Sequence, residues 1–263
     1  MLRGTISHVV AEFVDVPAHG RVFRTTRRVH LGDVDTSGAL RLEAVARYLQ
    51  DVATDDADDA QLSERRGVWV LRSTDLAISR LPRYHEAVEL ATFCSGIGPR
   101  WAERRTRLVG SHDARIESAS LWVFVDRERG RPLVLDDDFH ELYGASAQGR
   151  RVRGRLVHGA APPDAARRPW SLRASDFDVL DHVNNARSLE AIEDELVARL
   201  HGRTPVHARI EYRGTIERGD RVELMSTVDP EGRELAVWLS VDDDVRVSAT
   251  VTVAVGDATL RVH

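Results

Sequence analysis

The sequence predicts an α+β protein built from two tandem domains of one plan, each with a long helix packed against an antiparallel sheet. Residues 31–40 have the same plan as residues 174–183, so that Asp35 and Asp178 lie 143 residues apart (178 − 35). An amphipathic helix pattern follows each of these turns, and several runs rich in β-branched and aromatic residues follow each helix pattern. A helix with an apolar stripe needs a sheet face to cover it, which gives the predicted layers.

In the first repeat, the apolar spacing of Leu42, Val45, Ala46, Leu49 and Val52 predicts a helix. Glycines and a proline interrupt the residues that follow and divide them into strands. The expected strands are Val68–Leu76, Ala87–Cys94, Ala102–Val109 and Arg115–Val125.

In the second repeat, a helix is expected on Ala186, Leu189, Ile192, Leu196 and Leu200. Between the repeats, Gly144–Pro169 is rich in Gly, Ala, Pro and Arg without a period, which is typical of an irregular crossover. The predicted division is therefore 1–143, a linker at 144–169, and 170–263. Strands are expected at His207–Tyr212, Arg221–Val228, Glu234–Ser240 and Val245–Val255.

The composition limits the classes of partner. A net charge of −5, from 37 basic and 42 acidic residues, offers no overall field for nucleic acid or an anionic membrane. With one cysteine, Cys94, no internal disulfide forms, and with no transmembrane run or signal peptide a cytoplasmic protein is expected. The acidic cluster Asp55, Asp56, Asp58 and Asp59 is expected to face solvent, and neither a metal nor a cofactor is expected.

The second turn concentrates acid, base and amide side chains. Asp178 precedes His182 by four residues, and Asn184 and Asn185 follow directly before the helix pattern. Such a turn places a carboxylate beside backbone N–H groups at a helix start, where a carbonyl oxygen can be held. We expect Asp178 to attack a carbonyl or to deprotonate a water that does, with His182 orienting the reactants.

Three stretches resemble the acyl-acyl-carrier-protein (acyl-ACP) thioesterases of the double hot-dog class. Residues 175–185 are similar to that family's Asp-x-Asp-x-Asn-x-His-Val-Asn-Asn signature. Residues 69–84 are similar to its strand before a proline turn, and residues 119–132 to the segment that closes its first domain. The resemblance implies two tandem hot-dog domains, hydrolysis of fatty acyl-ACP to free fatty acid, and an acyl carrier protein as partner.

Two positions depart from the family pattern. Leu180 stands where the pattern has asparagine, and Thr215 and Ile216 stand where it has glutamate and cysteine. Glu217 lies two residues beyond Thr215, and if the strand continued, it would share a face with Thr215 and supply the missing carboxylate. Asn184, Asn185, Thr215, Glu217 and Asp35 are therefore the expected substrate-binding residues.

The first turn keeps Asp35 but has Ala39, Arg41 and Leu42 where the second has histidine and the two asparagines. The first domain is therefore expected to bind the acyl chain beside a degenerate site, and the second domain to be catalytic. Acyl-CoA hydrolysis and a non-catalytic acyl sensor remain alternatives. The chain is expected to be a monomer or a homodimer.

Overall fold

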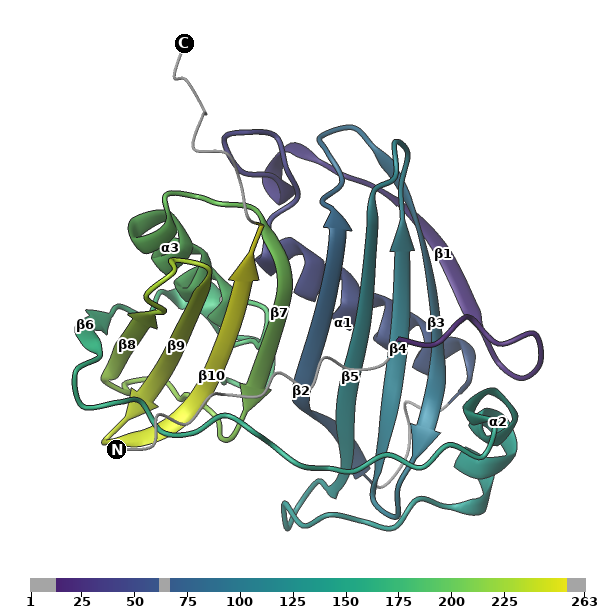
Figure 1. Cartoon of the computed structure of the whole chain (residues 1–263). Coiled ribbons are helices and arrows are strands. Elements are labelled where there is room, and N and C mark those ends of the chain that lie inside the picture. Colours follow the sequence, from purple (N-terminus) through teal and green to yellow (C-terminus); the bar gives the residue numbers. More distant parts are fainter. Residues whose placement is uncertain (1–12, 62–66, 255–263) are drawn as a thin grey trace.

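The computed structural model describes residues 13–61 and 67–254 (Figure 1). Its centre is one ten-stranded antiparallel sheet with the strand order β1-β3-β4-β5-β2-β7-β10-β9-β8-β6. The first five strands of this order come from the N-terminal half: β1 (Phe23–Arg28), β2 (Gly67–Arg80), β3 (Ala87–Ile97), β4 (Trp101–Val109) and β5 (Arg115–Asp126). The other five come from the C-terminal half: β6 (Ala166–Trp170), β7 (Pro205–Tyr212), β8 (Val222–Val228), β9 (Glu234–Val241) and β10 (Asp244–Val253).

The two halves repeat one topology. Within each half the strands are arranged first, third, fourth, fifth and second in chain order, which confirms two tandem domains of the same plan. β2 and β7 pair antiparallel from Ser73–Glu211 to Ala77–His207 and make one continuous sheet. Because the second strand of each half lies at this junction, the halves are related by an approximate two-fold axis.

Two long helices, α1 (Leu42–Asp59) and α3 (Ser188–Leu200), lie on the same face of the sheet, behind it in Figure 1. α1 contacts β3, α3 contacts β8 and β9, and the helices contact one another. Their apolar faces and the facing strand residues form one buried core across both halves. The core holds both helices in place. The turn that contains Asp35 precedes α1, and the turn that contains Asp178 precedes α3.

Residues 148–165 cross the opposite face of the sheet (Figure 1). The indole N–H of Trp101 donates to the Val152 carbonyl at 2.9 Å, and that of Trp238 donates to the Gly159 carbonyl at 2.9 Å. The buried Glu211 carboxylate accepts the Val157 N–H at 2.6 Å. The crossover is irregular but held at several points.

Three elements were not predicted. α2 (Asp137–Ala147) takes up the start of the predicted linker, and β6 takes up its end. The Asp136 carboxylate caps α2 by accepting the Phe139 N–H at 2.9 Å. β1 and β6 are short edge strands with many exposed charged residues, so they lack the apolar alternation that identifies a strand. Val255, in the last predicted strand, lies outside the described residues.

The expectation that the acidic cluster faces solvent is wrong for Asp56. This residue is fully buried on α1, and its carboxylate accepts bonds from Arg21, Arg104 and the Tyr143 hydroxyl at 2.7, 2.6 and 2.8 Å. Helical period places Asp56 on the inner face of α1, four residues after Val52. This ionic cluster ties α1 to β4 and α2.

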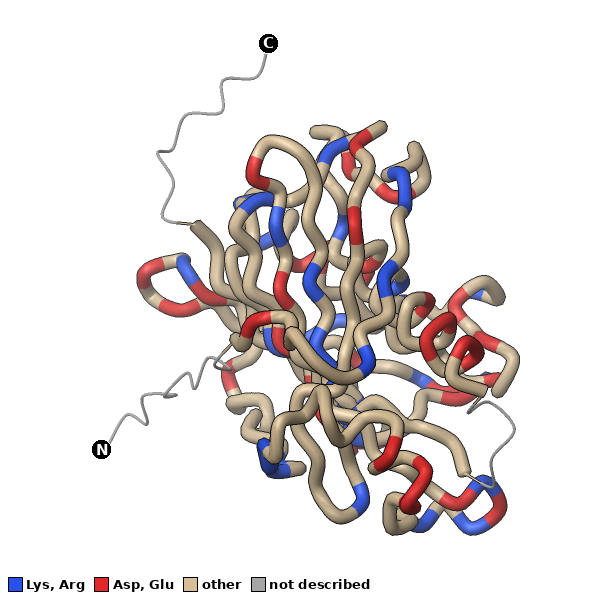
Figure 2. Tube along the Cα trace, turned by 90° about the vertical axis from the view of Figure 1, so that its right-hand side faces the viewer, with Lys and Arg blue, Asp and Glu red and all other residues tan. Residues whose placement is uncertain are grey.

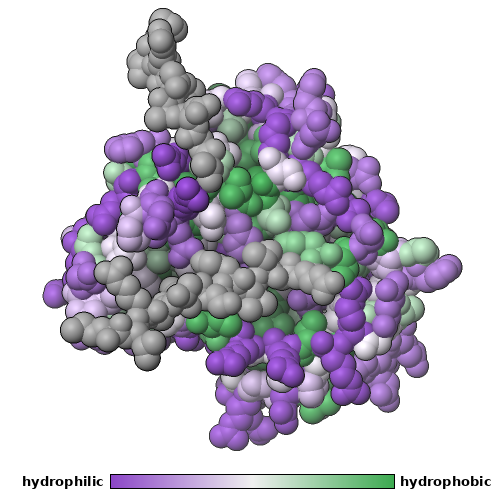
Figure 3. Space-filling view, viewed as in Figure 1, coloured by the Kyte–Doolittle hydropathy of each residue, from purple (hydrophilic) through white to green (hydrophobic). Residues whose placement is uncertain are grey.

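The surface carries both signs of charge. Figure 2 shows basic and acidic residues interspersed along the strands and loops of one side. On the face in Figure 3, hydrophobic side chains gather over the middle of the sheet and hydrophilic ones surround them. Among the described helices, none has the length and apolar character to cross a membrane.

Candidate active site

The second turn is a short hairpin between the 3₁₀ turn Ala174–Asp176 and the start of α3. The Asp181 N–H donates to the Asp178 carbonyl at 3.0 Å, and the Asp178 N–H donates to the His182 carbonyl at 3.0 Å. Asp181 has a φ of 57°, in the left-handed region that favours glycine. This backbone brings Asp178 and His182 to opposite sides of one hairpin.

The Asp178 side chain is half-buried and lightly held. Its Oδ1 accepts the Leu180 N–H at 2.9 Å, and its Oδ2 lies 3.4 Å from the Asn184 Nδ2. Leu180, which departs from the family pattern, is 68% exposed and points away from the core. The carboxylate therefore keeps lone pairs for a water or a substrate.

Asn184 shapes the entry to α3. Its Oδ1 accepts the Ala186 N–H at 2.9 Å, and its carbonyl accepts the Arg187 N–H at 2.9 Å. Two backbone N–H groups at this helix start, those of Ala186 and Arg187, are thus occupied. The Asn185 N–H donates to no acceptor among the described residues, so it is the candidate oxyanion donor at this helix start.

His182 is half-buried and forms a backbone bridge with Glu217. The loop that carries Thr215 and Glu217 lies against the turn, because the Val183 N–H donates to the Ile216 carbonyl at 2.9 Å. β7 ends at Tyr212, so the strand does not continue to these residues and gives them no shared strand face. Both side chains are exposed, and the Thr215 Oγ1 lies 3.5 Å from the Glu217 Oε1.

Arg218 braces the turn from the same loop. Its guanidinium donates to the Asp181 Oδ1 at 2.7 and 3.0 Å, and it stacks over the Phe177 ring at 4.3 Å. The hydrogen bond to Arg218 holds the pKa of Asp181 below its usual range. No sequence signal identified this contact, because the two residues are far apart in the chain, Arg218 belongs to no motif, and the signature that covers residues 175–185 leaves the Asp181 position variable.

Asp35 lies in the equivalent turn of the first half, where it is exposed. Its Oδ1 accepts the Ser37 N–H, the Ser37 hydroxyl and the Ala39 N–H at 2.8, 2.7 and 3.0 Å. These bonds stabilise the turn itself. The structure does not bring Asp35 together with Asp178.

A small cavity of about 20 Å³ begins at the start of α3. Asn185, Ala186 and Leu189 of this helix start line it, and so does Trp122 of β5. Ala46 and Leu49 of α1 also line it, whereas Leu42 and Val45 of the same helix are buried in the core. The other lining residues are Gln50, Leu71, Thr74, Leu76, Ser120, Ile210 and Tyr212.

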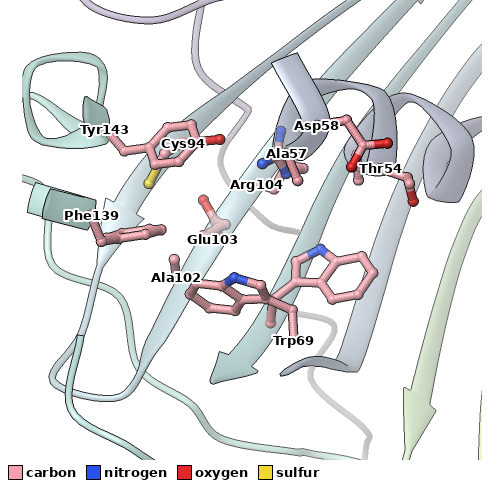
Figure 4. Close-up of a pocket in the computed structure, with 12 residues that line it drawn as sticks. Thr54, Ala57, Asp58, Trp69, Cys94, Ala102, Glu103, Arg104, Phe139 and Tyr143 are labelled. Carbon is pink, nitrogen blue, oxygen red and sulfur yellow. The ribbon is translucent and has the colours of Figure 1, made fainter. Parts of the chain in front are cut away.

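A larger cavity of about 250 Å³ lies on the same side of the sheet, between α1, α2 and the first-half strands (Figure 4). Trp69, Phe139 and Tyr143 form an aromatic wall, and burial raises the pKa of the Cys94 thiol in that wall to about 11. Trp122 lines both cavities and therefore stands between them. Within residues 13–61 and 67–254, no three His, Cys, Asp or Glu side chains gather as a metal site.

Two protein-family models match most of the chain. The model of the acyl-ACP thioesterase N-terminal domain matches residues 20–143, and that of the C-terminal domain matches residues 160–254. The chain belongs to the acyl-ACP thioesterase family. It is therefore a thioester hydrolase, and the family's activity is the hydrolysis of fatty acyl-ACP.

Two relatives are similar to the chain over most of its length. The chain is 28% identical over 236 residues to the uncharacterised protein Rv2001 of Mycobacterium tuberculosis, an alignment that covers 90% of the chain and 94% of that protein. It is 23% identical over 238 residues to the chloroplastic acyl-ACP hydrolase FATB2 of Cuphea viscosissima. That alignment covers 81% of the chain and 57% of the plant protein.

Solved structures confirm the double hot-dog fold of the thioesterase. A putative oleoyl thioesterase from Lactobacillus plantarum superposes with a TM-score of 0.78 at 20% identity, covering 91% of this chain and all of that one. The 12:0-ACP thioesterase of Umbellularia californica gives 0.75 at 19% identity, covering 90% and 98%.

Proposed function

We propose that this thioesterase hydrolyses fatty acyl-ACP at the turn of its C-terminal half, with Asp178 as general base. A water beside Asp178 attacks the thioester carbon while the carboxylate takes its proton. The tetrahedral intermediate then breaks its C–S bond, and the leaving thiolate takes a proton from Asp178. The products are a free fatty acid and the carrier's thiol.

Asn185 and His182 serve this reaction in different ways. The Asn185 N–H binds the carbonyl oxygen as it becomes negative, helped by the positive end of the α3 dipole. His182 orients the thioester or the water from the other side of the hairpin. Asn184 positions both the helix start and the general base. Its amide oxygen accepts the Ala186 N–H, and its amide nitrogen lies near the Asp178 carboxylate.

Thr215 and Glu217 belong to the loop that pairs with this hairpin, so we place them at the entrance for the carrier's pantetheine arm. Their exposed side chains suit a contact with a polar, extended group. Asp35 stabilises the turn of the first half, and we give it no part in the chemistry.

The single observation that carries this proposal is the position of the small cavity. Its wall includes Asn185 at the start of α3 and also Trp122, which lines the larger apolar cavity as well. An acyl chain whose carbonyl meets Asn185 has this apolar route into the N-terminal half. The acyl-binding role therefore goes to residues 1–143 and the catalytic role to residues 170–263, with 144–169 as linker.

The test is a panel of acyl-ACP and acyl-CoA thioesters of graded chain length, assayed for released thiol with the purified protein. Turnover of acyl-ACP supports the proposal. A preference for acyl-CoA would mean that coenzyme A, and not the carrier protein, carries the acyl group of the substrate. Tight acyl binding without release of thiol would make the protein an acyl sensor. A cytoplasmic location and a monomeric or homodimeric state are part of this proposal and need separate measurement.

A further inference from the structure

The approximate two-fold axis gives each residue of one helix start an equivalent in the other. The Arg41 N–H donates to the Asp33 carbonyl at 2.9 Å, and the Asn184 N–H donates to the Asp176 carbonyl at 2.8 Å. Because these bonds match, the offset of 143 residues between equivalent positions also holds for the residues of α1 and α3. Leu42 is thus equivalent to Asn185, and Gln50 of α1 is equivalent to Glu193 of α3.

In the first half, the helix start is already occupied. The Leu42 N–H donates to the Glu193 Oε1 at 2.5 Å, so a carboxyl group from α3 caps α1. Arg187 adds a second link between the helices, 3.2 Å from the Glu43 carboxylate. No N–H remains at Leu42 for a ligand.

In the second half, the corresponding position is open. Asn185 and Gln50 line the same small cavity, and among the described residues neither the Asn185 N–H nor the Gln50 carboxamide has a hydrogen-bond partner. Gln50 is half-buried on α1 and is contributed by the N-terminal domain. Two polar groups without partners in one cavity wall are a place for a polar group of the substrate.

We propose that Gln50 is a catalytic residue supplied across the domain junction, and that its Nε2–H donates to the thioester carbonyl oxygen beside the Asn185 N–H. The inference rests on the proposed function of the Asp178 turn. An amide at this position is a neutral donor and favours the oxyanion. A carboxylate, as at Glu193, would occupy the N–H and repel that charge.

The test uses two variants. Gln50→Met keeps the side-chain length but removes the donor, and Gln50→Glu places a glutamate opposite the second helix start, as Glu193 stands opposite the first. We expect Gln50→Met to lower kcat for acyl-ACP about 100-fold with KM changed less than threefold. Gln50→Glu is expected to be at least as inactive near neutral pH, and to recover in part at lower pH, where a protonated carboxyl can donate.

The matched control is Glu193→Gln, the reverse exchange in the equivalent position, which is expected to keep kcat within threefold. Thermal unfolding of each variant separates loss of fold from loss of chemistry. A Gln50→Met variant that keeps kcat within threefold overturns the inference. Asp178→Asn, assayed beside it, separates the two claims: if Asp178→Asn remains active, the proposed site itself is wrong.

Discussion

The two half-sites share a backbone and differ in what their side chains leave available. In both, an Asp-x-x-x turn precedes a helix start and closes with matched hydrogen bonds. Asp35 Oδ1 accepts three bonds within its own turn, whereas Asp178 is half-buried and lightly held. A fold repeated twice thus provides one site that stabilises structure and one that can react.

The residues next to the two turns also differ, and again the second half leaves more groups available. Gly38 has a φ of 79° without strain, while its equivalent, Asp181, adopts a φ of 57° and is held by Arg218. The first helix start is capped by Glu193, and the second opens into a cavity. The comparison teaches that catalytic capacity follows from groups left without internal partners.

The largest expected effect is the contrast between Asp178→Asn and Asp35→Asn. Asparagine keeps the turn bonds at either position but cannot take a proton from water. We expect Asp178→Asn to lower kcat about 1000-fold and Asp35→Asn to change it less than threefold. The measurement is steady-state release of thiol from acyl-ACP. The reverse result would mean that the first half is catalytic.

The next effect concerns the division of labour between the halves. Trp122 separates the small cavity at Asn185 from the larger one, so Trp122→Ala joins them. We expect the ratio of kcat/KM for longer over shorter acyl chains to rise about 10-fold, because each extra methylene gains an apolar contact. Leu142→Ala, outside both cavity walls, is the control. An unchanged ratio would place the acyl chain elsewhere.

A smaller effect on kcat is expected from loss of the hydrogen bonds that Arg218 donates to Asp181, whose backbone is in the left-handed region. Arg218→Ala should lower kcat about threefold to fivefold, since an exposed ion pair contributes little. The double variant Arg218→Ala/Asp181→Gly should restore most of the loss, because glycine accepts this φ as Gly38 does. Failure of the glycine to restore activity would show that Arg218 acts by another contact.

The smallest effect is on stability and depends on pH. Burial, with a contribution from Glu43, raises the pKa of Glu193 to about 7. Because the folded pKa lies above the unfolded one, stability present below about pH 4.5 is lost as pH rises through 7. The midpoint of thermal unfolding should therefore fall by a few degrees over this range, and Glu193→Gln should flatten the slope. An equally steep slope in Glu193→Gln would contradict this pKa.

The sequence predicted the elements whose residues alternate or repeat clearly. α1, α3 and the eight central strands have apolar positions at regular spacing, and their bounds differ from the prediction mostly by a few residues. β1 and β6 were missed because they lack apolar alternation, and α2 was missed because its last residues, 144–147, share the Gly- and Ala-rich composition of the predicted linker. The two-fold order of strands cannot be read from local pattern, since it depends on which edges pair.

The candidate site was predicted in part. Asp178, His182 and the two asparagines form a local motif, and the structure places them on one hairpin and helix start. Their roles stay predictions until the variants are assayed. Gln50, Trp122 and Arg218 lie on other elements, and only the folded arrangement brings them to the turn or its cavity.

The pairing of β2 with β7 has a consequence for how such a site can evolve. Two identical chains joined edge to edge would place the same residue at both helix starts, so any change would alter both at once. Fusion into one chain removes that constraint. Here a glutamine faces one helix start and a glutamate the other, an asymmetry that a symmetric pair of identical subunits cannot reach.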